Sequence, residues 1–247
     1  MELKGRVGLV TGGSSGIGAE TVKALAKRGC KVVIGYNNGA KRAASLLESL
    51  HGSGHNCLKI NLGDQDLLQR AEKFVKKNYG KLDFLINSAG YTEPIKHSDL
   101  ASLSPTKFNS IVNTNAGGTY AVIRTFVPLL SITSGATVIN VSSVSAFTGS
   151  GSNIAYCAAK AAIDTMTISL ARALGPQIRV LCVSPASVAT NFVKGRTEEH
   201  LRAIADHTPM KKIITAKEVS LGILACLTHL TSATGTKIVI DGGHHIR

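Results

Sequence analysis

Short apolar runs alternate along the chain with longer segments whose apolar residues recur at helical spacing. The strand-like runs are Val7–Val10, Val32–Ile34, Cys57–Ile60, Leu82–Ile86, Ala136–Val141, Ile178–Val183 and Lys237–Ile240. The helical patterns are Ile17–Lys27, Ala40–Leu50, Asp64–Asn78, Pro105–Leu130, Ala155–Leu174 and Ala216–Leu230. Apolar strands that alternate with helices are typical of a parallel sheet with both faces covered. The pattern predicts one α/β domain, residues 1–247, built on a doubly wound, mostly parallel seven-stranded sheet of Rossmann type.

One polar stretch interrupts this alternation, between about residues 188 and 212. It follows Ser184-Pro185-Ala186, and Thr197-Glu198-Glu199 has the composition of a helix start. An insertion after a late strand lies at the carboxyl edge of a parallel sheet, where ligands bind in this architecture. We therefore expect a substrate lid at about 188–212, the alternative being an ordinary surface excursion.

Composition excludes several classes of protein. The net charge is +13, but the basic residues are scattered and no nucleic-acid-binding motif accompanies them, so we expect no nucleic-acid partner. No apolar run reaches the roughly 18 residues of a membrane span, and we expect no membrane partner. Five cysteines and no signal peptide favour a reducing, cytoplasmic location. His51 and His55 lack acidic or cysteine neighbours, so no metal site is expected.

A glycine-rich segment joins the first apolar strand to the first helix, with Gly12, Gly16 and Gly18 spaced as Gly-x-x-x-Gly-x-Gly. Glycine permits a tight turn and the close approach of backbone to a pyrophosphate. The following helix contributes free N–H groups and the positive end of its dipole. The segment predicts a phosphate-binding loop for a dinucleotide, although alone it could be a structural turn.

Tyr156 and Lys160 lie four residues apart on a predicted helix and therefore share a face. A lysine ammonium near a phenol stabilises the phenolate, and we expect it to lower the tyrosine pKa toward working pH. A tyrosine of this kind can give a proton to, or take one from, a carbonyl or alcohol oxygen. The pair predicts proton-transfer chemistry beside the dinucleotide.

With these motifs the whole chain resembles the short-chain dehydrogenase/reductase family in its compact form, and it is similar to 3-oxoacyl-carrier-protein reductases. Besides the two motifs above, the resemblance rests on Asn87-Ser88-Ala89-Gly90, Asn115-Ala116-Gly117-Gly118, Ser143 placed 13 residues before Tyr156, Pro185 to Thr190, and Asp241-Gly242-Gly243. By that resemblance Tyr156 is the acid/base, Ser143 positions the substrate oxygen, Lys160 depresses the Tyr156 pKa and binds the nicotinamide ribose, and Asn115 holds a water in a proton relay.

The resemblance also implies the residues that contact the cofactor. These are Gly12, Ser14, Ser15, Gly16, Ile17, Gly18, Tyr36, Asn37, Asn38, Asn61, Leu62, Asn87, Ala89, Gly90, Tyr156, Lys160, Pro185, Val188 and Thr190. Three positions depart from the family pattern: Ser88 replaces an Asn, Ala186 replaces a Gly beside the nicotinamide, and Asn61 replaces an Asp that many members have near the adenine.

The residues after the second strand bear on the choice of cofactor. An acidic residue there would hold the ribose 2′-hydroxyl and repel a 2′-phosphate. Between Cys30 and Leu47 there is no Asp or Glu; Tyr36 takes that position, and Lys41 and Arg42 follow. We therefore expect NADP(H) rather than NAD(H), although the two cations could simply form a solvated helix face.

These expectations combine into one hypothesis: an NADP(H)-dependent oxidoreductase that interconverts a carbonyl and an alcohol. The substrate is a small molecule or is linked to a carrier protein, and one candidate activity is 3-oxoacyl-carrier-protein reduction. Reduction of another carbonyl, in a polyketide, diketone, sugar or steroid-like compound, and a non-catalytic dinucleotide-binding regulator are the alternatives. The predicted helices Pro105–Leu130 and Ala155–Leu174 are apolar on more than one face, which predicts a homotetramer or homodimer.

Overall fold

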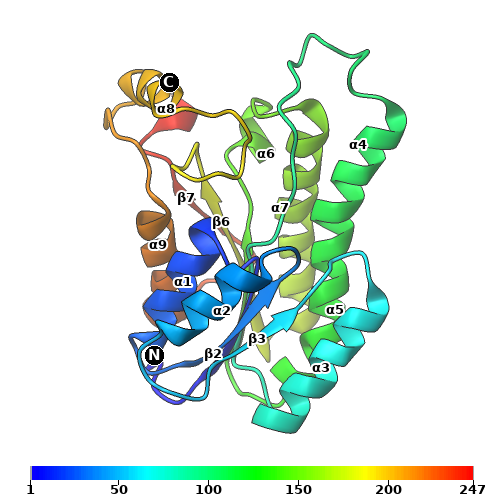
Figure 1. Ribbon diagram of the computed structural model, residues 1–247, viewed down its shortest axis with the longest axis vertical. Coiled ribbons are helices and arrows are strands. Elements are labelled where there is room, and N and C mark those ends of the chain that lie inside the picture. Colours follow the sequence, from blue (N-terminus) through cyan, green and yellow to red (C-terminus); the bar gives the residue numbers. More distant parts are fainter. Residues whose placement is uncertain (1, 247) are drawn as a thin grey trace.

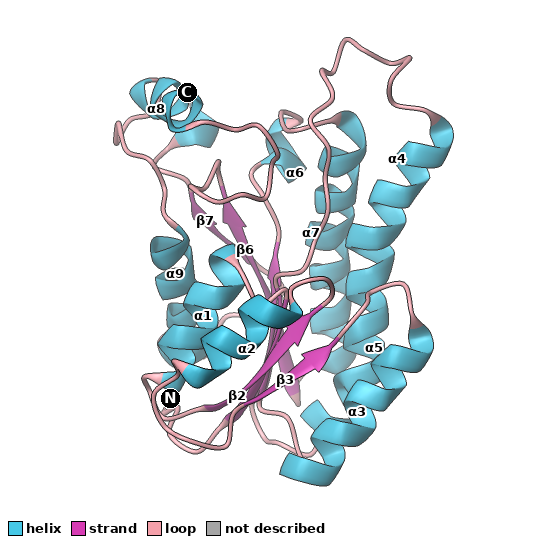
Figure 2. Ribbon diagram, viewed as in Figure 1, coloured by secondary structure: helices cyan, strands magenta, loops and turns pink. Residues whose placement is uncertain are grey.

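The computed structural model describes residues 2–246, so Met1 and Arg247 of the predicted domain lie outside the described residues. Its centre is a seven-stranded sheet in the order β3-β2-β1-β4-β5-β6-β7, with every neighbouring pair parallel (Figure 2). The strands are β1 (Val7–Thr11), β2 (Lys31–Tyr36), β3 (Asn56–Lys59), β4 (Phe84–Asn87), β5 (Ala136–Val141), β6 (Ile178–Pro185) and β7 (Lys237–Ile240). The predicted doubly wound Rossmann-type sheet is confirmed.

Helices cover both faces of the sheet (Figure 1). They are α1 (Gly16–Ala26), α2 (Ala40–Glu48), α3 (Gln65–Tyr79), α4 (Pro105–Val112), α5 (Gly118–Leu130), α6 (Ser145–Thr148), α7 (Ile154–Leu174), α8 (Glu198–Asp206) and α9 (Ala216–Thr228). One buried cluster packs the sheet against α1, α2 and α9, and a second packs it against α3, α5 and α7. Because β1, β4 and β5 are buried along their whole length, their apolar runs show no alternation.

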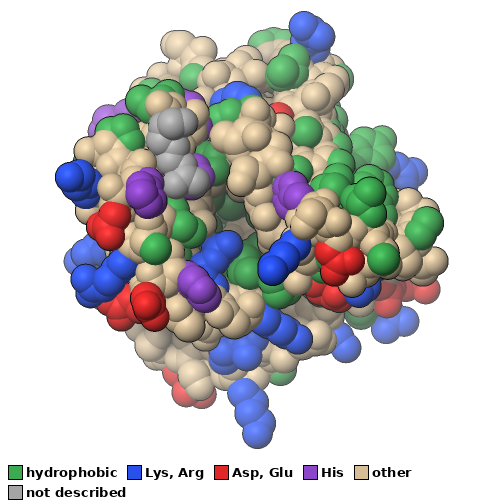
Figure 3. Space-filling model, turned by 90° about the horizontal axis from the view of Figure 1, so that it is seen from above, with side chains coloured by type: hydrophobic (Ala, Val, Ile, Leu, Met, Phe, Trp, Pro, Cys, Tyr) green, Lys and Arg blue, Asp and Glu red, His purple; other side chains and the backbone are tan. Residues whose placement is uncertain are grey.

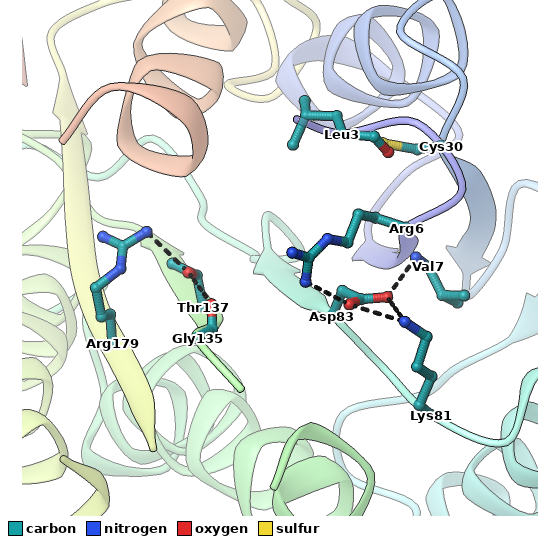
Figure 4. A network of polar contacts seen from close by, with 9 residues as sticks. All are labelled: Leu3, Arg6, Val7, Cys30, Lys81, Asp83, Gly135, Thr137 and Arg179. Atoms are coloured by element: carbon teal, nitrogen blue, oxygen red, sulfur yellow. Dashed lines mark hydrogen bonds and ion pairs between the residues drawn. The ribbon is translucent and has the colours of Figure 1, made fainter. Parts of the chain in front are cut away.

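Ion pairs and hydrogen bonds, with a buried Asp83 at their centre, hold the amino-terminal ends of the strands (Figure 4). The fully buried Asp83 accepts from Arg6 Nη1 at 2.9 Å and from the Val7 amide at 2.8 Å, and it also pairs with Lys81. Arg179, at the start of β6, donates to Thr137 Oγ1 of β5 at 2.9 Å and to backbone carbonyls beyond α9. A buried carboxylate is tolerated only with such partners, and this network fixes strand ends opposite the edge where β1 leads into α1.

The predicted helix Pro105–Leu130 is interrupted. Between α4 and α5 the chain forms a π-helical turn, η1 (Asn113–Gly117). It forms because Nδ2 of the buried Asn115 donates a hydrogen bond to the Ile111 carbonyl at 2.8 Å. A side chain that makes a hydrogen bond to a helical backbone group displaces the regular i→i−4 backbone hydrogen bond. The π turns that result are frequent at functional sites. The short helix α6 and the 3-10 turn η2 (His244–Ile246) carried no recognised sequence signal.

The segment after β6 departs from the alternating pattern as expected. The helix start predicted at Thr197-Glu198-Glu199 is confirmed: α8 begins at Glu198, and the Thr197 side chain caps it by accepting from the His200 amide. Leu201 and Ala205 anchor α8 by their burial, while most of its other side chains are exposed. In Figure 1, α8 lies beyond the ends of β6 and β7.

Helix α7 bears on the expectation that no apolar run is long enough to cross a membrane. Among the described residues it is the one helix that length and composition would allow to do so, with a mean hydropathy of 1.2 over an 18-residue window. It is not an uninterrupted apolar run, because Lys160, Asp164 and Arg172 lie within it. In the fold, α7 packs on β6 and α4, and 39% of the window is buried. Helix α7 is rich in apolar residues because one of its faces covers the sheet. A second apolar face of α7 is covered only in part by other helices.

Candidate active site

A cleft of about 1300 Å³ opens at the carboxyl-terminal ends of the central strands. It is bounded by the β1–α1 loop, the ends of β4 and β5, the first turns of α7 and the segment that leads to α8. Seen from above, this face is hollowed near its middle, and Lys and Arg side chains lie beside the hollow (Figure 3). Neighbouring strands β1 and β4 lead to helices on opposite faces, which leaves a crevice at this place in a doubly wound sheet.

Close backbone packing explains the glycines of the β1–α1 loop. A Cβ on Gly18 would lie 2.3 Å from the Gly12 carbonyl oxygen, and one on Gly12 would lie 2.9 Å from the Ala89 amide nitrogen. Gly12 and Gly16 also have φ values of +63° and +52°, in the left-handed region that glycine adopts without strain. A side chain on Gly12 would collide with the chain that follows β4, one on Gly18 would collide with the loop itself, and one on Gly16 would press on Thr190.

The start of α1 fits a pyrophosphate. Its N-cap, Ser15, is extended and makes no side-chain capping bond, so the first N–H groups of α1 have no such partner. No acidic residue lies in the first turn of α1. Free N–H donors and a positive dipole end, reached over a glycine cradle, are what a dinucleotide diphosphate needs.

Tyr156 and Lys160 meet on the cleft wall, as their spacing predicts. Asn153 caps α7 by accepting from the Tyr156 amide at 2.7 Å, which fixes the helix turn that carries the tyrosine. Lys160 is buried, and its Nζ lies 5.5 Å from the centroid of the Tyr156 ring. The ammonium donates to the Val141 carbonyl at 2.7 Å.

The electrostatics of this pair differ from the expectation. Burial raises the pKa of Tyr156 above its usual value, and the Ser143 hydroxyl and the Arg196 guanidinium offset part of that rise. Burial lowers the pKa of Lys160 itself to about 8. Tyr156 is therefore protonated at neutral pH and is set to donate a proton.

Ser143 stands beside Tyr156 at the end of β5. Its Oγ accepts from the Ser145 amide at 3.1 Å and donates to the Ser145 hydroxyl at 3.1 Å. Only 7% of Ser143 is exposed, so its hydroxyl has a fixed position on the cleft wall. The hydroxyl has one proton, so to donate to a substrate oxygen that also accepts from Tyr156 it must turn that proton away from the Ser145 hydroxyl.

Asn115 lies behind the cleft wall. Its Nδ2 donates to the carbonyls of Tyr91 and Ile111 at 2.7 and 2.8 Å, and its Oδ1 accepts from the Tyr91 amide at 3.2 Å. Asn115 thus ties the π turn to the loop that follows β4. Its predicted role in a proton relay stays a prediction.

The adenosine end of the cleft is lined by Asn37, Asn38 and Gly39, followed by Arg42 of α2. A Cβ on Gly39 would lie 2.5 Å from Ser14 Oγ and 2.7 Å from Arg42 Nη2, so these two polar groups approach each other across the glycine. Tyr36 is half-buried against the core below α2 and does not line the cleft.

Most of the residues predicted from the sequence line this one cleft. They are Gly12, Ser14, Ser15, Gly16, Ile17, Asn37, Asn38, Asn61, Leu62, Ala89, Gly90, Ser143, Tyr156, Lys160, Pro185, Val188 and Thr190. Four others do not form its wall: Gly18 and Asn115, described above, the half-buried Tyr36, and Asn87. Asn87 instead donates to Asn140 Oδ1 at 2.9 Å and so links β4 to β5.

Two residues of the 188–212 segment lie in the cleft although no sequence signal marks them. Phe192 and Arg196 line the cleft, and the ring of Phe192 lies 5.9 Å from that of Tyr156. No local spacing rule points to them, because their place depends on how the segment from β6 to α8 folds over the sheet edge. In the described residues no group of three His, Cys, Asp or Glu side chains could hold a metal ion.

Comparisons with known proteins agree with this geometry. A family model described as enoyl-(acyl carrier protein) reductase matches residues 12–245. The 3-oxoacyl-(acyl-carrier-protein) reductase of Chlamydia muridarum is 32% identical, over 98% of this chain and 98% of that protein.

Solved structures of a short-chain dehydrogenase and of a ketoacyl reductase have the same fold as this chain. A short-chain dehydrogenase from Burkholderia cenocepacia in complex with NADP has a TM-score of 0.88 at 28% identity, covering 99% of both chains. A 3-ketoacyl-(acyl-carrier-protein) reductase from Brucella melitensis, complexed with NADH, also has a TM-score of 0.88, at 26% identity over 98% of this chain and 99% of that one. The two neighbours thus hold different nicotinamide cofactors.

Proposed function

This chain belongs to the short-chain dehydrogenase/reductase family, and we propose that it reduces a carbonyl to an alcohol, reversibly, with NADP(H) and with Tyr156 as the acid/base. Membership makes it an oxidoreductase that binds a nicotinamide dinucleotide. The observation that carries the proposal is the convergence of Ser143, Tyr156 and Lys160 on one cleft wall, in the cleft that the phosphate loop also lines.

Ser143, Tyr156 and Lys160 have separate roles in the proposed carbonyl reduction. A bound nicotinamide supplies the hydride that adds to the carbonyl carbon. Ser143 donates a hydrogen bond to the carbonyl oxygen and holds it near the Tyr156 hydroxyl. Tyr156 gives its proton to that oxygen as the negative charge develops there, and the proton is replaced from solvent. Lys160, buried under the ring, supplies positive charge that favours the transient phenolate.

The raised pKa of Tyr156 supports reduction as the favoured direction at neutral pH. A general acid must hold its proton when the substrate arrives, and burial keeps the Tyr156 hydroxyl protonated. Alcohol oxidation needs the deprotonated form and should therefore become faster at alkaline pH.

Arg42 supports the choice of NADP(H). Beside the adenosine end of the cleft, Ser14, Lys23, Lys41 and Arg42 line a small adjoining cavity that no Asp or Glu lines. Glu20, the one carboxylate that lines the main cleft, accepts from Lys23 at 2.8 Å. Cations without a competing acid favour a 2′-phosphate over a 2′-hydroxyl.

Replacement of Arg42 by alanine tests the preference for NADP(H). The wild-type enzyme should use NADPH with a kcat/KM at least about tenfold above that for NADH, which corresponds to about 1.4 kcal/mol. Arg42→Ala should remove most of that preference by raising the KM for NADPH, while Arg70→Ala, an exposed arginine of α3, should leave it unchanged. Equal use of both cofactors by the wild type would refute the NADP(H) assignment.

A 3-oxoacyl group on a carrier protein is one candidate substrate. Its support is the similarity to 3-oxoacyl-carrier-protein reductases, together with the exposed Arg124 and Arg172, which an acidic carrier could contact. NADPH oxidation should be measured over β-ketoacyl thioesters, diketones and sugars. Turnover of thioesters alone would support the carrier-linked substrate, and absence of turnover with every compound, despite NADPH binding, would favour a non-catalytic regulator.

We further propose that the segment at about 188–212 acts as the substrate lid. Val188, Phe192, Arg196 and Ile204 from this segment line the cleft together with Tyr156. Limited proteolysis should cleave this segment in the free protein, and cofactor with substrate should slow the cleavage. Unchanged cleavage would assign the segment to an ordinary surface excursion.

A further inference from the structure

Arg196 is a cation inside the substrate end of the cleft that lacks a side-chain partner. It lies between β6 and α8, is partly buried, and lines the cleft together with Tyr156. Among the residues that the structure describes, its guanidinium has no ion pair or hydrogen bond. In contrast, Arg179 makes four hydrogen bonds, and Arg202, six residues further along the same segment, pairs with Glu198 at 2.7 Å.

A partly buried guanidinium without an acceptor is unfavourable, because burial removes water from five N–H donors. The nearby carboxylates do not meet this need. Glu198 is engaged by Arg202, and Glu93, on the loop that follows β4, pairs with Lys107 at 3.2 Å. Among residues 2–246, Glu20 is the only acid that lines the cleft, and it belongs to the adenosine end. An acceptor from outside the chain would complete the surroundings of Arg196.

The position of Arg196 shows which part of a substrate it would meet. Arg196 lines the same cleft as Tyr156, and Phe192, four residues earlier in the same segment, places its ring 5.9 Å from that of Tyr156. The segment that carries the guanidinium therefore lies on the side of the cleft where the carbonyl is protonated. Phe192 limits the space there: its ring lies 5.9 Å from that of Tyr156, and a Cβ on Gly90 would lie 3.7 Å from it. An anion bound by Arg196 is therefore close to the reacting carbonyl and belongs to a short molecule.

We propose that Arg196 determines specificity by binding the carboxylate of a short oxo acid whose carbonyl is reduced at Tyr156. A guanidinium presents paired N–H donors that match a carboxylate, and the pairing is strong where water is excluded. The inference rests on the proposed function, since it assigns the substrate class of the same site. It distinguishes free oxo acids from neutral ketones, esters and thioesters of the same length.

The first test compares acids with their own esters. NADPH oxidation is measured with 2-oxobutanoate, acetoacetate and 4-oxopentanoate and with the methyl ester of each. The best acid should exceed its ester in kcat/KM by at least about tenfold. Arg196→Gln should lower that acid-to-ester ratio at least tenfold, mainly through the KM of the acid, and Arg196→Lys should restore part of it. Arg202→Gln is the matched control and should leave the ratio unchanged.

A binding measurement separates failure of this inference from failure of the proposed function. Calorimetry with Tyr156→Phe protein saturated with NADP+ should show binding of the acids, and the double variant with Arg196→Gln should lose it by tenfold or more in Kd. Esters reduced as well as acids, or a ratio that Arg196→Gln leaves unchanged, would overturn the role of Arg196 and leave carbonyl reduction standing. Weaker NADPH binding by Arg196→Gln alone would assign the guanidinium to the cofactor phosphates and equally overturn it. No NADPH binding by the wild type would defeat the proposed function itself.

Discussion

At the scale of single residues, the charge state of Lys160 and Tyr156 sets the chemistry. The helical spacing of the two residues correctly predicts that they meet, but it cannot predict how much water surrounds them. Burial opposes ionisation of both groups: it raises the pKa of Tyr156 and lowers that of Lys160 to about 8. At neutral pH the site therefore holds a protonated Tyr156 beside a Lys160 ammonium whose charged form is opposed by burial. Keeping this charge in the cleft wall lowers the stability of the fold in favour of its function.

The buried ammonium makes stability depend on pH in a definite direction. The pKa of Lys160 falls from 10.5 to about 8 on folding, so the unfolded chain holds this proton more tightly between those pH values. The penalty is complete below about pH 8 and is relieved as pH rises toward 10.5.

Lys160→Met should therefore raise the free energy of unfolding at pH 7 by about 1–2 kcal/mol, since relief of the penalty exceeds loss of the bond to Val141. The gain should shrink as pH rises from about 8 to 10.5, and activity should be lost. Urea unfolding at several pH values measures this, with the exposed Lys27→Met as the control. A gain that does not change with pH would contradict the burial argument.

At the scale of elements, the π turn between α4 and α5 decides how the cleft wall is built. The helical spacing of apolar residues predicted one unbroken helix over Pro105–Leu130. The Asn115 side chain that bonds to the Ile111 carbonyl is held in place by the Tyr91 backbone, a contact between residues 24 positions apart. Periodicity reports local structure, so it could predict both halves of this helix and not the bond that divides it.

The neighbouring glycines of this turn give a matched pair of variants. A Cβ on Gly118 would lie 2.6 Å from Leu62 Cβ, in the cleft wall, whereas one on Gly117 would meet nothing within 4 Å. Gly118→Ala should lower the free energy of unfolding by about 1–3 kcal/mol and weaken NADPH binding. Gly117→Ala should be neutral or stabilising by up to about 1 kcal/mol. Thermal unfolding and cofactor titration measure both; equal effects of the two variants would contradict this packing.

The same contrast explains which site residues the sequence could predict. The glycine loop, Ser143 and the Tyr156/Lys160 pair lie at strand ends and on one helix turn, where spacing along the chain fixes spacing in the fold. Phe192 and Arg196 come from an irregular segment whose path follows from its packing over the cleft. Tyr36 shows the reverse error: it occupies the expected sequence position at the end of β2, but its ring packs on the core while Asn37 and Asn38 face the cleft.

At the scale of the whole molecule, α5 and α7 leave apolar side chains uncovered. Several apolar residues of the predicted helices Pro105–Leu130 and Ala155–Leu174 are buried within the fold, among them Ile111, Val122, Phe126 and Ile163. Tyr120 remains 50% exposed and Ile168 43% exposed, on neighbouring helices of one face. Exposed apolar residues that gather on one face mark an interaction site, and a second copy of the chain satisfies it by two-fold symmetry.

We predict that the protein is a homodimer or homotetramer through this face. Ile168→Arg should yield a smaller species by light scattering, because a guanidinium cannot be buried there without a partner. Activity should fall with it, since α7 also carries Tyr156 and Lys160. Ile132→Arg, at a residue 60% exposed after α5, should change neither property. An active wild-type monomer at micromolar concentration would refute the assembly.

The central claim is that Tyr156 protonates a carbonyl while a nicotinamide held in the same cleft reduces it. Single-turnover oxidation of bound NADPH by wild type and by Tyr156→Phe, each mixed with the best substrate of the panel, tests this most directly. The phenylalanine keeps the ring and its contacts and removes only the hydroxyl. The rate should fall by about two orders of magnitude or more, with the Kd for NADPH changed less than about threefold. An undiminished rate in the variant would remove Tyr156 from the reaction and contradict the account.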